Sequence, residues 1–178
     1  GHEVTVITPQ EAEHEAFAKE HGVQIKDMGP LKWKEIPLKG KGLVFLFSRI
    51  LKRFSNLLFQ YPDIQLTGMV KRALAREKGY DLLISIAMPH PVHWGVALAR
   101  SKEHPIAKVW MADCGDPFMG YENDSFINPF YFKYVEKWFC RHADFISVPT
   151  KGAVEAYYPE FRHKIKVIPQ GFNFSEIE

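Results

Sequence analysis

Residues 81–113 contain three consecutive segments, DLLISIA, PVHWGVALARSK and AKVWMAD, that together indicate the fold. The first segment, residues 81–87, is an apolar run typical of a strand buried on both faces of a parallel sheet. Residues 91–102 have a helical pattern, and residues 107–113 form the next apolar run. A strand, a helix and a second strand in this order predict a βαβ unit.

The same alternation extends in both directions from this unit. Further strands are expected at residues 2–8, 23–28, 144–150 and 164–169. Further helices are expected at residues 9–22, 43–61, 63–78, 128–143 and 151–159. The sequence therefore predicts an α/β protein with a Rossmann-like, doubly wound and mainly parallel sheet flanked by helices.

Composition limits the class of protein. The 178 residues suffice for one domain with a sizeable core. No apolar run is long enough to span a membrane. The two cysteines provide no disulfide framework, so we expect a reducing, cytoplasmic setting. The net charge of +2 is unevenly distributed, because residues 26–78 hold twelve Lys or Arg against four Asp or Glu. Such a basic segment favours an anionic partner.

Polar or turn-forming residues follow four successive expected strands. In open α/β sheets, ligands bind in the crevice at the carboxyl ends of the strands. The candidate site residues at these ends are His90, His93, Asp113, Asp116, Thr150, Gln170, Gly171 and Asn173. This placement is expected of a binding site, although any fold of this type has polar turns at this edge.

Two carboxylates, Asp113 and Asp116, follow one expected strand and precede Pro117. They could cap the turn, since Asp-Pro is a common turn pair. Alternatively, one of them binds substrate hydroxyls or orients an acceptor as a base. We take both as candidate catalytic residues and leave the turn interpretation open.

His90 and His93 lie at the start of an expected helix. They are candidates for contacts to a sugar hydroxyl or phosphate, and packing histidines are the alternative. No third ligand lies at a persuasive spacing, so no metal site is predicted. Nothing marks Cys114 as an activated nucleophile.

Residues 43–61 have a helical apolar stripe with basic residues on another face. Either this is a core helix with a basic solvent face, or it lies on a membrane surface. The candidate membrane-surface residues are Trp33, Lys34, Arg49, Lys52 and Arg53. Anionic lipids attract such segments, whereas no nucleic-acid-reading motif is present.

The C-terminal part carries a recognisable motif, HADFISV followed by KIKVIPQGFN. It resembles the segment ADxIxxxS…KIxVIPNGVD of GT-B fold, family-4-type glycosyltransferases. The matching positions are Ala143, Asp144, Ile146, Lys164, Ile165, Val167, Ile168, Pro169 and Gly171. Residues 1–9 and 81–118 are similar to further segments of that family. The chain differs at Gln170, where relatives usually have Asn, and at Gly115, where they carry Arg or His.

The resemblance implies the N-terminal, acceptor-side domain of a retaining glycosyltransferase. Such an enzyme moves a sugar from a nucleotide-sugar donor, its co-substrate, to a glycan or lipid-linked acceptor, as in cell-envelope polysaccharide synthesis. No other cofactor, metal or nucleic acid is implied. The family's first strand with its glycine-rich loop and its donor-binding C-terminal domain have no counterpart in residues 1–178. We therefore expect this segment alone to be inactive.

Two other functions stay open at this point. One is a non-catalytic membrane-binding or regulatory module with the same fold. The other is a different nucleotide-handling enzyme of the Rossmann type, although no G-x-G-x-x-G motif follows any expected strand.

Overall fold

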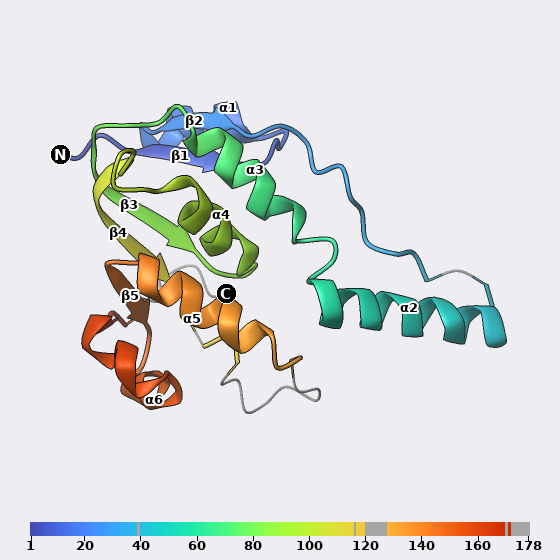
Figure 1. Ribbon diagram of the computed structural model, residues 1–178. Coiled ribbons are helices and arrows are strands. Elements are labelled where there is room, and N and C mark those ends of the chain that lie inside the picture. The colour runs from blue at the N-terminus through green and yellow to red at the C-terminus, as the bar shows by residue number, and fades with distance from the viewer. Residues whose placement is uncertain (39, 116, 120–127, 170, 172–178) are drawn as a thin grey trace.

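The computed structural model describes residues 1–38, 40–115, 117–119, 128–169 and 171 (Figure 1). The strands are β1 (Thr5–Thr8), β2 (Gln24–Asp27), β3 (Tyr80–Ile86), β4 (Ala107–Asp113), β5 (Phe145–Val148) and β6 (Ile165–Val167). The helices are α1 (His14–His21), α2 (Leu43–Phe59), α3 (Gln65–Leu74), α4 (Pro91–Ala99), α5 (Phe132–His142), α6 (Lys151–Ala156) and the 3₁₀ helix η1 (Pro159–Lys164). Strands alternate with helices, which confirms the predicted α/β class.

Every strand pair in the described part of the chain is parallel. The strands form two sheets, a pair β1-β2 and a four-stranded sheet in the order β3-β4-β5-β6. In the larger sheet the carboxyl ends are aligned, since Ile86 pairs with Asp113 and Asp113 pairs with Ser147. This aligned edge is called the strand-end edge below.

One hydrophobic core lies between the four-stranded sheet and helices α3 to α6. Trp110 and Ala112 of β4 and Ile146 of β5 are fully buried in it. From the helices, Trp94 and Phe139 pack into the same cluster. The aromatic residues of α5 are therefore mainly core residues, with Tyr134 exposed.

Local chemistry explains several helix ends. Gly22 ends α1 in the left-handed conformation, with φ of 63°. Pro91 occupies the first turn of α4, where its missing N–H costs nothing. The Thr150 hydroxyl oxygen accepts a hydrogen bond from the Ala153 N–H and caps α6.

Helix α2 differs from the other long helices because none of its residues is buried. It extends away from the sheets in Figure 1. The interpretation of residues 43–61 as a core helix is therefore wrong. An amphipathic pattern indicates that one face of a helix is covered, but not what covers it.

Candidate functional site

Asp113 is the last residue of β4 and lies at the strand-end edge. Its Oδ1 accepts a hydrogen bond of 2.7 Å from the Ser147 hydroxyl on β5. Its backbone carbonyl accepts from the Ala87 N–H, directly after β3. None of the described residues donates to Oδ2. The carboxylate is thus fixed by one oxygen, and the other remains able to accept from a ligand hydroxyl.

His93, on the first turn of α4, is fully buried. Its Nδ1 lies 2.8 Å from the Ser85 hydroxyl, which also accepts from the Trp110 indole N–H. Its Nε2 lies 3.5 Å from the Cys114 sulfur. Burial, followed by the neighbouring His90, lowers the pKa of His93 to about 3. The ring is neutral at physiological pH, and both of its nitrogens have protein partners.

His90 lies one helical turn earlier, with its ring centroid 5.8 Å from that of His93. Burial lowers the pKa of His90 to about 4. Its Nδ1 is buried and has no hydrogen-bond partner among the described residues. An unpaired buried nitrogen costs free energy.

Cys114 and Gly115 continue the chain beyond Asp113. Burial raises the pKa of the Cys114 thiol to about 12, so it is not a nucleophile at neutral pH. Gly115 has a φ of 60°, in the left-handed region where a side chain is strained. This backbone conformation favours glycine at position 115.

The remaining predicted site residues divide into two groups. Thr150 and Gly171 lie beyond the ends of β5 and β6 and are exposed, and the Thr150 hydroxyl oxygen is used as the α6 cap. The structure thus brings His90, His93 and Asp113 together around the β3 and β4 ends. Asp116, Gln170 and Asn173 lie outside the described residues.

Sequence reasoning missed Glu136, a buried carboxylate on α5. Its Oε1 accepts from the Phe118 backbone N–H at 2.7 Å, and its Oε2 accepts from the Tyr158 hydroxyl at 2.9 Å. Burial is the main cause of its raised pKa. Glu136 therefore holds the chain shortly after Asp113 and the β4 end, and acts as a positioning residue for that segment.

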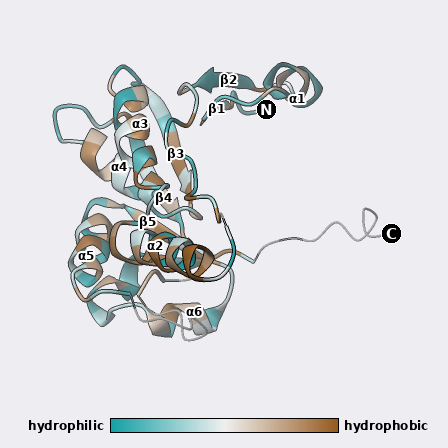
Figure 2. Ribbon diagram, turned by 90° about the vertical axis from the view of Figure 1, so that its right-hand side faces the viewer, coloured by the Kyte–Doolittle hydropathy of each residue, from teal (hydrophilic) through white to brown (hydrophobic). Residues whose placement is uncertain are grey.

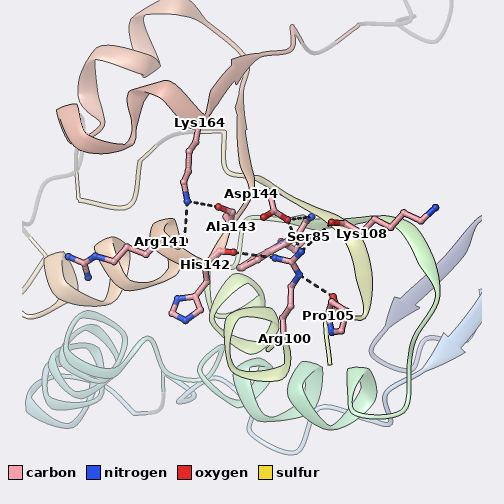
Figure 3. Close-up of polar contacts among 10 residues, drawn as sticks. Ser85, Arg100, Pro105, Lys108, Arg141, His142, Ala143, Asp144 and Lys164 are labelled. Carbon is pink, nitrogen blue, oxygen red and sulfur yellow. Dashed lines mark hydrogen bonds and ion pairs between the residues drawn. The ribbon is translucent and has the colours of Figure 1, made fainter. Parts of the chain in front are cut away.

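Two residues of the C-terminal motif, Asp144 and Lys164, have structural roles at the amino ends of β5 and β6 (Figure 3). Asp144 accepts from the Trp110 backbone N–H at 2.8 Å and pairs with Arg100 at 2.8 Å. The Lys164 ammonium donates to three carbonyls at the end of α5, at 2.8 to 3.1 Å. These are the carbonyls that a helix leaves unpaired at its C-terminus.

Replacing Lys164 with methionine is expected to lower the free energy of unfolding by about 2 kcal/mol, because hydrogen bonds to a charged donor are lost. Urea unfolding followed by circular dichroism measures the change. Lys133→Met, at an exposed position of the same helix, is the control and should have little effect. Equal stabilities of the two variants would contradict this role of Lys164.

Two cavities beside α2 are not lined by the strand-end residues. The first, of about 620 Å³, is apolar and lies between α2, α4, α5 and the segment before α2. Its lining includes Trp33, Phe59, Trp94 and Phe132. Three of the predicted membrane-surface residues, Arg49, Lys52 and Arg53, line the second cavity beside α2.

Among the described residues, no group of three or more His, Cys, Asp or Glu side chains is placed to hold a metal ion. None of the described helices is both long and apolar enough to cross a membrane.

These features define a Rossmann-like α/β domain with polar groups gathered at the carboxyl ends of parallel strands. The profile of Glycosyltransferase Family 4 matches residues 1–176, and the chain belongs to this family. The matched region corresponds to the N-terminal half of the GT-B fold. Comparison with curated proteins and with solved structures gives no match.

Proposed function

We propose that this domain binds the acceptor of a retaining glycosyltransferase at its strand-end edge. Family membership implies a sugar donor and an acceptor. The observation that carries the proposal is the Asp113 carboxylate, which is fixed by Ser147 and lies beside the turn that bears His90. A fixed carboxylate with one available oxygen suits an acceptor hydroxyl, which is a hydrogen-bond donor.

In the proposed reaction, a hydroxyl of a glycan or lipid-linked acceptor attacks the anomeric carbon of the donor sugar. The bond from that carbon to the nucleotide diphosphate breaks, and the new glycosidic bond keeps the anomeric configuration. Asp113, with Asp116 as the second candidate, orients the hydroxyl and accepts its proton. Positioning and charge stabilisation supply most of the rate, so neither a metal nor a further cofactor is required of this domain.

The histidines have different roles in this proposal. His90 is neutral, and its buried Nδ1 has no partner among the described residues; in this proposal it accepts a hydrogen bond from a sugar hydroxyl once the turn that bears it moves to admit the acceptor. His93 makes no ligand contact in this proposal. Its two ring nitrogens contact Ser85 and Cys114 and so help to fix the position of the first turn of α4. Thr150 and Gly171, which follow β5 and β6, are further candidates for acceptor contacts in this proposal. Gln170 and Asn173 lie outside the described residues and are candidates from the sequence alone.

The setting is proposed to be cytoplasmic, where nucleotide-sugars are available. Cys114 and Cys140 are both free and buried, as expected where thiols are kept reduced. The proposal does not specify the donor sugar, so the experiment below uses a panel of donors.

Asp113→Asn in the full-length protein is expected to lower kcat/KM by about 100-fold or more, because the amide cannot accept the proton. The assay measures nucleoside diphosphate release from a panel of UDP- and GDP-hexoses with oligosaccharide and polyprenyl-phosphate acceptors. NMR of the product tests retention at the anomeric carbon.

The matched control is Asp81→Asn, at an exposed aspartate at the amino end of β3. It should retain activity. Unchanged activity of Asp113→Asn would remove this carboxylate from the reaction. Absence of transfer with every donor and acceptor would instead favour the non-catalytic module.

A further inference from the structure

From Leu43 to Phe54, helix α2 presents an apolar face that no other described helix or strand covers. Leu43 is 84 % exposed and Phe47 is 67 % exposed, although such side chains are normally buried. The other exposed large apolar side chains of the helix are Val44, Phe45, Leu46, Ile50, Leu51, Phe54 and Phe59. A contiguous exposed patch of this kind marks an interaction surface.

Most apolar residues of α2 lie on one side of the helix, whereas Phe45 and Phe59 lie on the same side as Arg49 and Lys52. At 100° per residue, the positions from Leu43 and Phe47 to Ile50 and Phe54 fall on one side. Arg49, Lys52 and Arg53 fall on the other side with the remaining polar residues. Figure 2, which looks along α2, colours much of the helix as hydrophobic.

The preceding segment, described over residues 30–38, lies beside α2 and adds to the same surface. Trp33 stacks on Tyr61, with ring centroids 5.9 Å apart, and Glu35 forms an ion pair with Lys52. Lys32 and Lys34 are exposed beside Trp33, which is itself 48 % exposed. Residues 31–60 contain seven Lys or Arg and one acidic residue, a net charge of +6.

We propose that α2 and residues 30–38 dock on an anionic lipid bilayer, with α2 lying in the plane of the interface. The apolar face of α2 would enter the region between headgroups and acyl chains, and Trp33 would lie at headgroup level. The lysines and arginines would remain among the anionic headgroups, which attract them. The docking does not depend on the transfer reaction.

The charge of the surface favours a bilayer over a second copy of this chain. Two copies meeting face to face would bring two clusters of net charge +6 together, and like charges in an interface are unfavourable. A bilayer with anionic lipids offers an apolar layer and negative charge in the same arrangement as α2.

Co-sedimentation of the full-length protein with two kinds of vesicle tests the proposal. The vesicles are phosphatidylcholine alone and a 7:3 mixture of phosphatidylcholine and phosphatidylglycerol. We expect at least about tenfold stronger binding to the anionic vesicles, reduced by 0.5 M NaCl because salt screens the attraction.

Two variants separate the apolar and basic contributions. Phe47→Glu should weaken binding to anionic vesicles by about tenfold or more, because a charge would enter the apolar region. Phe17→Glu, at an exposed phenylalanine on α1, is the matched control and should bind like the wild type. Arg49→Gln should weaken binding by about fivefold on anionic vesicles only.

Failure of the folded protein to bind either kind of vesicle would overturn the proposal, as would equal binding to both. Sedimentation velocity tests the alternative, in which a second copy of this chain binds the apolar face of α2. A concentration-dependent dimer that Phe47→Glu abolishes, without vesicle binding, would assign the face to a second copy. Loss of transfer activity in Asp113→Asn with normal vesicle binding would leave the docking proposal intact.

Discussion

Acidification from pH 7.5 to pH 5 is expected to cost the protein about 3 kcal/mol of stability through two imidazoles, since each pKa unit corresponds to about 1.4 kcal/mol. The folded-state pKa values of His90 and His93 are lowered to about 4 and about 3. In the unfolded chain both rings take up protons near pH 6.5. The stability that they contribute is therefore complete above pH 6.5 and is lost as the pH falls towards the folded-state values.

The contribution of His93 is the more secure of the two, because its side chain is fully buried. His90 retains some contact with water, so its share is smaller. Glu136 acts in the opposite direction, since its raised pKa means that the folded protein gains stability as this carboxyl is protonated. The total pH dependence is the sum of these opposing effects.

Comparison of the wild type with His93→Gln isolates one imidazole. Urea unfolding at pH 7.5 and pH 5.0 gives four free energies of unfolding. The variant is less stable at pH 7.5, but its loss on acidification should be smaller than that of the wild type by about 2 kcal/mol. An unchanged loss on acidification would show that His93 does not titrate as described.

Local sequence patterns were sufficient to predict the strands of the larger sheet and the helices between them. The apolar runs at residues 81–87 and 107–113 became β3 and β4, and the intervening pattern became α4. The separation of β1-β2 from β3–β6 was not predictable, because pairing between strands depends on distant segments. The position of α2 was not predictable either, because a core helix and a surface helix have the same amphipathic pattern.

The candidate site was predictable in place but not in detail. The strand-end rule located His90 and Asp113 correctly at one edge, whereas the burial of both His93 nitrogens could not be inferred from sequence. Glu136 was missed because a charged residue in a helix normally faces water. A signal was available, because Glu136 lies four residues from both Phe132 and Cys140 on the buried face of α5.

Gly95 is an unfavourable residue for a helix interior, but the close packing of α4 on α3 requires it. Glycine in the middle of a helix costs about 1 kcal/mol relative to alanine. In α4, however, a β-carbon at Gly95 would lie 2.6 Å from the Val70 Cβ and 2.9 Å from the Thr67 carbonyl oxygen of α3. The missing side chain allows the two helices to approach closely, beneath the turn that carries His90.

Gly95→Ala is therefore expected to lower the free energy of unfolding by about 3 kcal/mol, because overpacking outweighs the gain in helix propensity. Urea unfolding at pH 7.5 measures the change. Gly68→Ala on α3 is the matched control, since its new β-carbon would meet only the end of the Arg72 side chain, at 3.3 Å. That control should be neutral or slightly stabilising. A Gly95→Ala variant as stable as Gly68→Ala would mean that α3 and α4 can separate without cost, and that the close helix contact does not fix the position of the His90 turn.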